Sequence, residues 1–323
     1  MRSFYKYMPY STLIKFLKDP CLRVTPSNCQ NDPFEFGYSS SDLEILNSKS
    51  SSKELGFKLK EFAELHGIIS LTTSYKNIMM WSHYAENHRG AVVELHIDEK
   101  KPESLFINST GPNKPPFNFQ DFIFNKVSYS KTRKFDLVEP ERQLENVKHH
   151  YYFTKAIQWE GENEHRFITP MLWVNRIIFN QEGYEKAQRI LGDYSSAICC
   201  NKNTGYTTYE LEEAAIEVIA LRNIELLAEL WLESNINEIM FFTRLNTGTP
   251  GIGGGRVGRI FIGCEADHKD LISQLKSNNS DQLSIMDNYL NPINGDLVKV
   301  FKAEIHQDEY KLTFKPVNGN VHS

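Results

Sequence analysis

Residues 67–97 read GIISLTTSYKNIMMWSHYAENHRGAVVELHI, and this stretch does most to decide the fold class. Residues 68–72 are a short apolar run, which predicts a buried strand. Residues 77–87 carry aromatic side chains at helical spacing, so we expect a helix there. Gly90 then precedes residues 91–97, a second apolar run that predicts another strand. Strand, helix and strand follow one another within one short segment, which is typical of a mixed fold.

The segments on either side continue this irregular alternation. Further strands are expected at residues 4–7, 22–25, 122–129, 164–169 and 259–263, and helices at 12–18, 53–66, 140–158 and 267–276. Residues 298–305 and 310–314 alternate on the two sides of a polar turn, which predicts a terminal β-hairpin. The mixture predicts an α+β fold with a mostly antiparallel mixed sheet and flanking helices.

Composition excludes several classes of protein. The chain has 323 residues, with 36 Lys and Arg against 41 Asp and Glu and a net charge of −5. This mild acidity argues against a protein that grips duplex nucleic acid mainly by counterion release. No apolar run reaches the roughly 18 residues of a membrane-spanning helix, and the first residues lack the apolar core of a signal peptide. The five cysteines show no zinc-ligand spacing, so we expect a reduced, cytoplasmic protein without structural zinc.

Residues 209–238 concentrate acidic side chains. Glutamate stands at positions 210, 212, 213, 217, 225, 229, 233 and 238. A solvated helical face is the first interpretation of such a pattern. The alternative is a docking face for a basic partner protein.

Residues 247–258 are rich in glycine, which invites comparison with phosphate-binding loops. The run lacks the Lys-Ser/Thr pair of such loops, and a strand rather than a helix follows it. We therefore interpret it as a loop without a phosphate site.

The segment MWSHYAENHRG at residues 80–90 is the densest candidate site. On a helix, Trp81 and Tyr84 share a face, and Tyr84 and His88 lie one turn apart. This face would offer a stacking surface, a phenol and an imidazole, with His83 one residue before Tyr84. The alternative is that the aromatic residues belong to the core and the histidines cap the helix.

The turn-forming segment NDPFE at residues 31–35 is the second candidate. Pro33 fixes its own φ and favours an extended residue before it, while Asn31 and Asp32 can close the turn by accepting from backbone amides. The turn is either purely structural or presents Asp32 and Glu35 into a cleft.

The segment WEGENEHRF at residues 159–167 is the third candidate. If a strand begins near Glu162, then Glu162, Glu164 and Arg166 share one face. Neighbouring carboxylates repel unless a cation pairs with them, and such pairing adjusts their pKa toward acid or base roles. The alternative is an exposed strand end with a simple Glu–Arg pair.

These segments, in this order, carry a family resemblance. Residues 5–7 (YKY), 22–35, 80–90 and 155–166 closely resemble the bacterial DUF2971 family, whose members are uncharacterised. The resemblance covers roughly residues 4–170 and is weaker at residues 259–263 and in the final hairpin. It implies a phage-defence or toxin setting and leaves the activity open.

The resemblance also implies a division of the chain. Residues 1–170 correspond to a DUF2971-like core. Residues 171–256 depart from it and are expected to be an insertion, helical at 173–205, acidic at 209–238 and glycine-rich at its end. Residues 257–323 would complete the core with a strand, a helix and a hairpin.

The N-terminal layout is also loosely similar to ADP-ribosyltransferase-type toxins. That similarity implies Tyr5 or Lys6 as the first strand residue, Trp81 or Tyr84 as the ring that stacks on nicotinamide, and Glu164 as the late glutamate. The chain departs from those toxins because it has no Ser-Thr-Ser strand and no Arg or His at the first position.

We therefore expect a single pocket that binds a nucleotide or an NAD-like ligand, with NAD as substrate and no bound metal. The activity would be ADP-ribosyl transfer or NAD hydrolysis. The expected catalytic residues are Glu164, His83 and Tyr84, and the expected ligand-binding residues are Tyr5, Lys6, Asn31, Asp32, Glu35, Trp81, His88 and Arg166. Glu164 would stabilise an oxocarbenium-like transition state, and Asn31 or Arg166 would bind phosphate or ribose.

Two other functions compete with this one. A nuclease would hold Mg²⁺ with four carboxylates and activate water with His83, the carboxylates being Asp32, Glu35, Glu162 and Glu164. A non-enzymatic sensor subunit would bind a nucleotide or a phage protein in the same cleft and use residues 209–238 as its partner face.

Overall fold

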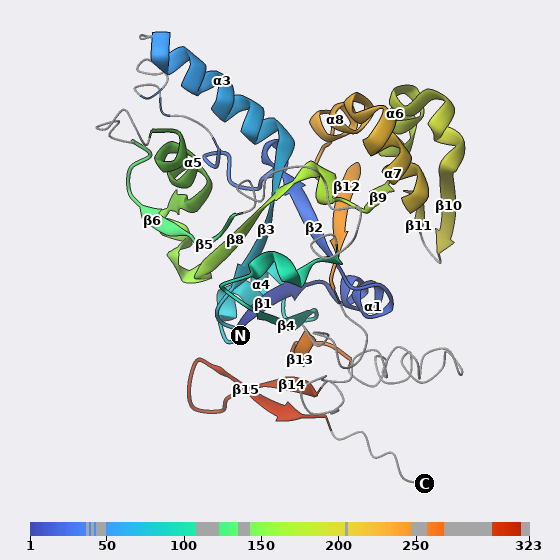
Figure 1. Cartoon of the computed structure of the whole chain (residues 1–323). Coiled ribbons are helices and arrows are strands. Elements are labelled where there is room, and N and C mark those ends of the chain that lie inside the picture. The colour runs from blue at the N-terminus through green and yellow to red at the C-terminus, as the bar shows by residue number, and fades with distance from the viewer. Residues whose placement is uncertain are drawn as a thin grey trace.

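A large mixed sheet organises the molecule (Figure 1). The computed structural model describes residues 1–36, 39, 42, 50–107, 123–134, 143–203, 206–246, 257–267 and 299–317. The strands are β1 (Arg2–Met8), β2 (Cys21–Pro26), β3 (His66–Thr72), β4 (Ala91–Ile97), β5 (Ile123–Lys126), β6 (Ser128–Ser130), β7 (Thr154–Ala156), β8 (Glu164–Pro170), β9 (Arg176–Phe179), β10 (Ile198–Asn203), β11 (Tyr206–Leu211), β12 (Ile239–Arg244), β13 (Val257–Ile262), β14 (Val300–Ile305) and β15 (Leu312–Pro316).

Helices flank this sheet. They are α1 (Tyr10–Lys18), α3 (Ser50–Leu65), α4 (Ile78–Tyr84), α5 (Gln143–Phe153), α6 (Gln181–Leu191), α7 (Glu213–Arg222) and α8 (Ile224–Leu232). Short 3-10 turns join them, including η1 (Ser27–Cys29) and η6 (Ile157–Glu162). In Figure 1, α3 and α5 lie beside the β3–β8 end, while α6, α7 and α8 gather over β9 to β12. No helix in the described ranges is long and apolar enough to cross a membrane.

The sheet is mostly antiparallel, as the sequence predicts. The strand order is β10-β11-β9-β12-β2-β3-β1-β4-β13-β14-β15, with β8 on β3 and β5 on β8. Within the sheet, β13 and β14 run parallel and the other described pairs run antiparallel. The predicted terminal hairpin is present as β14 and β15. The α+β class is thereby confirmed.

Strand β3 is the branch point of the sheet. It pairs with β8 along its whole length, from His66 to Thr72. A strand has two hydrogen-bonding edges, so β2 and β1 must share the other one. Strand β2 pairs near Ile68, and β1 pairs at Thr72. The two strands therefore separate beside Ser70, and we call this place the fork.

The two faces of the sheet differ at the fork because side chains alternate along a strand. Leu22 and Val24 of β2, Ile69 and Leu71 of β3 and Phe167 of β8 are buried in the main hydrophobic core. The intervening residues on the opposite face are polar. They are Arg23 and Thr25, Ser70 and Thr72, and Glu164 and Arg166. The strand pattern thus places a polar surface directly behind the core.

Helix α4 is held by its ends. The Asn77 side chain accepts hydrogen bonds from the Met79 and Met80 amides, which is an N-cap. After the helix, residues 86–88 have positive φ values of 52°, 51° and 66°. Gly90 follows at a close approach, since a Cβ there would lie 2.3 Å from the Met8 carbonyl oxygen. This turn fixes α4 against β1.

Three sequence predictions of helix are too long. The helix expected over residues 77–87 ends at Tyr84, because residues 86–88 turn away with positive φ. The helix expected over residues 140–158 ends at Phe153, because residues 154–156 pair with β6 and η6 follows. A helical piece is expected over residues 173–205, but among its described residues, 173–203, only Gln181–Leu191 is α-helix, and β9 and β10 flank it. These strands are too short for their period to separate them from helix in the sequence.

The described strands between residues 171 and 246 join the main sheet. Strand β12 pairs with β2 on one side and β9 on the other, so β9 to β12 continue the sheet of residues 1–170. The expectation that this region is an insertion stays a prediction. The glycine-rich residues 247–256 and residues 268–276 of the expected helix lie outside the described residues.

Candidate functional site

A cavity of about 290 Å³ opens on the polar face of the sheet at the fork. Its lining includes residues of β1, β2, β3, α4 and β8 together with the segment that joins η1 to the residue 31–35 turn. The charged residues that line it are Lys6, Arg23, Asp32, Glu35, Lys155, Glu162, Glu164 and Arg166. Four are cationic and four anionic, so the cavity is close to neutral as a whole and its chemistry depends on how the charges pair.

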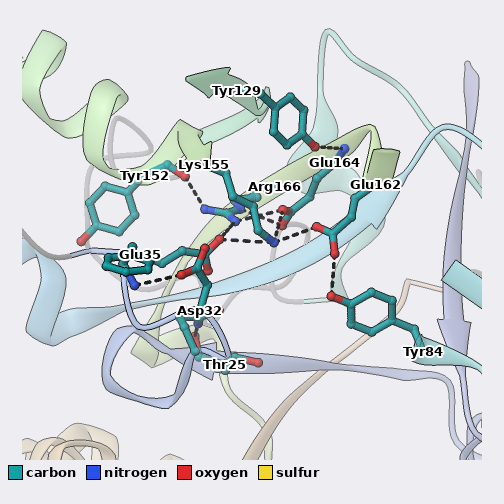
Figure 2. A network of polar contacts seen from close by, with 12 residues as sticks. Thr25, Asp32, Glu35, Tyr84, Tyr129, Tyr152, Lys155, Glu162, Glu164 and Arg166 are labelled. Atoms are coloured by element: carbon teal, nitrogen blue, oxygen red, sulfur yellow. Dashed lines mark hydrogen bonds and ion pairs between the residues drawn. The ribbon is translucent and has the colours of Figure 1, made fainter. Parts of the chain in front are cut away.

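Arg166 anchors the deepest part of the site (Figure 2). Its guanidinium binds both carboxylate oxygens of Glu164, Nε at 2.7 Å and Nη2 at 2.9 Å, and also bonds Glu35. Nη1 donates to the Tyr152 carbonyl at 2.9 Å. Burial alone would lower the pKa of Arg166, but the charges of Glu164 and Glu35 raise it. The guanidinium is therefore permanently charged, and four of its five N–H donors bind protein acceptors.

Lys155 joins three carboxylates. Its ammonium lies 2.7 Å from Glu162, 3.4 Å from Glu164 and 3.4 Å from Glu35. Burial alone would lower its pKa, but the charges of these three glutamates raise it. We call Glu35, Lys155, Glu162, Glu164 and Arg166 the carboxylate cluster. Two cations offset three anions in it, so an ionised cluster keeps an excess of one negative charge.

Glu164 is held in its ionised form. Burial alone would raise its pKa, but the charge and hydrogen bonds of Arg166 and the charge of Lys155 lower the pKa to about 2. Its backbone amide donates to the Tyr129 hydroxyl at 2.9 Å, which fixes the start of β8. The sequence alternative of an exposed Glu–Arg pair is wrong, because Glu164 and Arg166 are buried.

Tyr84 connects α4 to this cluster. Its hydroxyl donates to Glu162 Oε1 at 2.6 Å. Burial and this hydrogen bond to a carboxylate raise the pKa of Tyr84, so the phenol stays protonated. Thr72 of β3 also donates to the Glu162 carbonyl at 2.6 Å. Glu162 is therefore positioned from two sides.

Lys6 has a different environment. Its Nζ donates to the Ser70 carbonyl at 2.9 Å, at the fork. Among the described residues it forms no ion pair with a carboxylate. Burial lowers its pKa to about 8; the charge of Glu164 opposes this shift and that of Arg23 adds to it. A lysine of this kind is typical of functional sites.

The turn at residues 31–35 is both structural and part of the site. Asp32 Oδ1 accepts from the Phe34 amide at 2.9 Å, and the Asp32 carbonyl accepts from the Glu35 amide at 3.1 Å. Glu35 then reaches the carboxylate cluster, and Asn31 and Asp32 line the cavity. Both interpretations drawn from the sequence thus apply to this turn.

Three predicted site residues do not line the cavity. Trp81 is fully buried and packs edge-on against Tyr7, and its Nε1 donates to the Tyr75 carbonyl at 2.8 Å, so neither ring face is available to stack on nicotinamide. His83 is exposed to solvent. His88 lies in the positive-φ turn after α4, where its carbonyl accepts from the Glu265 amide at 3.0 Å. For Trp81, the alternative stated in the sequence analysis therefore applies, because this residue belongs to the core.

The remaining predicted residues do meet in one cavity. They are Tyr5, Lys6, Asn31, Asp32, Glu35, Tyr84, Glu164 and Arg166. Sequence reasoning missed Arg23 and Lys155. Arg23 had a usable signal, since a charged residue between Leu22 and Val24 in a strand marks the polar face. Lys155 had no such signal in the sequence, because its carboxylate partners are brought together only by the register of β8 against β3.

Comparison with known proteins matches part of the chain to a family model. No curated protein and no solved structure matches the chain. The looser similarity to ADP-ribosyltransferase-type toxins therefore gains no support and stays a hypothesis. The matching family model covers the segment from α4 to β8, which contains Tyr84 and most of the carboxylate cluster. Residues 80–167 of this chain match the family described as "Protein of unknown function (DUF2971)".

Proposed function

We propose that this cavity binds an NAD-like nucleotide and that the protein cleaves the bond between nicotinamide and ribose. The single observation behind this proposal is Glu164, a buried carboxylate held ionised beside a cavity. A fixed negative charge stabilises positive charge that develops in a transition state, and it does so most effectively in a buried site. Glycosidic bond cleavage develops such a charge on the sugar ring.

The proposed reaction is balanced as follows. The bond between nicotinamide N1 and ribose C1′ breaks, and its electron pair leaves with nicotinamide. The ribose becomes oxocarbenium-like, stabilised by Glu164. Water or an acceptor nucleophile then adds to C1′ and releases a proton. Addition of water is NAD hydrolysis, and addition of an acceptor is ADP-ribosyl transfer.

The rest of the cavity suits such a ligand. Tyr5, Tyr7, Met80, Tyr84 and Trp159 contribute apolar and aromatic surface to its lining. Its volume of about 290 Å³ lies near the lower end of small-ligand sites. This volume fits the nicotinamide and ribose end of a dinucleotide, with the remainder extending toward solvent.

The geometry favours this reaction over a magnesium-dependent nuclease. The position between Glu35, Glu162 and Glu164 that a metal ion would take is occupied by the Lys155 ammonium, 2.7–3.4 Å from their oxygens. Arg166 engages both oxygens of Glu164 as well. A divalent cation would have to displace both side chains.

The test is incubation of the purified protein with NAD and with mixed nucleic acids, with and without EDTA, followed by mass spectrometry. We expect release of nicotinamide that EDTA does not prevent. Degraded nucleic acid that EDTA protects would support the nuclease, and binding of NAD without turnover would support the sensor subunit. A role in phage defence or in a toxin system, and a partner at residues 209–238, stay predictions.

A further inference from the structure

Two cations at the fork have no carboxylate partner among the described residues. Lys6 donates only to the Ser70 carbonyl, and Arg23 donates only to the Ile236 carbonyl. Neither forms an ion pair within the described part of the chain. The Nε atom of Arg23 is buried and has no hydrogen-bond partner in the part of the chain that the structure describes. Both residues line the cavity.

This arrangement is costly in the free protein. The charge of Arg23 lowers the pKa of Lys6, so the two cations repel each other, and an unpaired buried donor loses its water without replacement. The charge of Glu164 offsets part of this cost for Lys6, but the hydrogen bonds of Glu35, Glu162 and Glu164 go to Lys155 and Arg166. An anion bound between Lys6 and Arg23 would remove both costs.

A buried acceptor in the same cavity is also unsatisfied. Asp32 is 5 % exposed, and its Oδ1 closes the turn by accepting from the Phe34 amide. Its Oδ2 is buried and finds no hydrogen-bond partner among the residues described. A carboxylate oxygen in this position can accept a hydrogen bond from a bound ligand, and a sugar hydroxyl is a suitable donor. The cavity is therefore suited to a single ligand that carries both an anionic group and a hydroxyl group.

We propose that the fork is the binding subsite for a sugar phosphate, in which Lys6 and Arg23 hold the phosphate oxygens and Asp32 accepts from a sugar hydroxyl. This assignment deepens the proposed function and rests on it for the wider ligand, but it requires binding only. It also replaces Arg166, which the sequence suggested for phosphate or ribose, because four of the five Arg166 N–H donors already bind protein partners.

The test is calorimetric titration with ribose 5-phosphate, ribose and inorganic phosphate. The variants are Arg23→Gln and, as a matched control, Arg89→Gln, an exposed arginine outside the cavity lining. We expect wild type and R89Q to bind ribose 5-phosphate more tightly than either fragment. R23Q should bind it about 10–100-fold more weakly, the usual loss for a charged hydrogen bond.

A second variant tests Asp32 without disturbing the turn. Asp32→Asn keeps one oxygen for the Phe34 amide and replaces the other by a donor. It should lose the preference for ribose 5-phosphate over inorganic phosphate, and thermal unfolding should confirm that each variant is folded. Equal affinity of folded R23Q and wild type, or no binding of ribose 5-phosphate to wild type, would overturn the assignment. Binding of ribose 5-phosphate without NAD cleavage would leave the subsite standing and reject the proposed function alone.

Discussion

Lys155 Nζ lies 2.7 Å from Glu162 Oε2, and the same ammonium also contacts Glu35 and Glu164 at 3.4 Å. These three carboxylates come from the turn at residues 31–35, the end of η6 and the start of β8. One cation thus ties the distant turn at residues 31–35 to η6 and the start of β8, which are neighbours in the sequence. The carboxylate cluster is for this reason a structural support as well as the centre of the candidate site.

Loss of Arg166 should destabilise the protein severely. Arg166→Met leaves the buried Glu164 without its bidentate partner, and breaking a buried pair in this way costs about 3–5 kcal/mol in free energy of unfolding. Urea denaturation measures this loss of unfolding free energy. The control is Arg2→Met, since Arg2 pairs with Glu99 at 3.0 Å on the surface and such pairs contribute about 0–1 kcal/mol. Similar small losses in both variants would show that the cluster does not support the fold.

Glu164 should make stability depend on acid pH. Its pKa falls from 4.5 to about 2 on folding, so its ionised form stabilises the native state above the unfolded pKa. This contribution should disappear as the pH falls from about 4.5 toward about 2. The measurement is urea denaturation across that range for wild type and Glu164→Gln. The difference between them should shrink with falling pH, and a constant difference would contradict the account.

Lys6 should make anion binding depend on alkaline pH. Its pKa of about 8 means that the amine loses its charge as the pH rises through that value, while the phosphate of ribose 5-phosphate stays doubly ionised. Affinity for ribose 5-phosphate should therefore fall between neutral pH and about pH 9 in wild type. Lys6→Met should bind weakly and without this dependence. A pH-independent wild-type affinity would remove Lys6 from the subsite.

His83 and Tyr84 should behave differently although they are adjacent. His83 is exposed and does not line the cavity, so His83→Ala should keep the NAD cleavage rate of wild type. Tyr84→Phe removes the 2.6 Å hydrogen bond to Glu162 and should slow cleavage. The rate of nicotinamide release, followed by chromatography, compares the H83A and Y84F variants. Loss of cleavage in H83A with Y84F unaffected would reverse this assignment and restore the histidine expected from the sequence.

The sequence predicts the class of the fold better than the arrangement of its site. Alternation of buried and polar residues in residues 22–25 is local, so it identifies β2 correctly. The fork is not local. It depends on β2 and β1 sharing one edge of β3, and no pattern within any single strand records that pairing.

The same limit explains the errors at individual residues. Trp81 and Tyr84 share a helix face by their spacing, yet α4 packs so that Trp81 enters the core and Tyr84 reaches Glu162. Spacing along the sequence cannot tell a core residue from a site residue on this helix, because the difference depends on which neighbours cover each side of it. Arg166 was expected to bind ligand, but its position opposite Ser70 brings it to Glu164 and Glu35 instead.

Nicotinamide release from NAD by Glu164→Gln tests the central claim most directly. The matched control is Glu160→Gln, because Glu160 is exposed and outside the cavity lining. Retained binding of ribose 5-phosphate would show that the E164Q cavity is intact, and Glu162→Gln serves as a second variant if E164Q does not fold. We predict release by wild type and E160Q and a loss of about 100-fold or more in E164Q. Release by E164Q at the wild-type rate, or no release by wild type, would contradict the account.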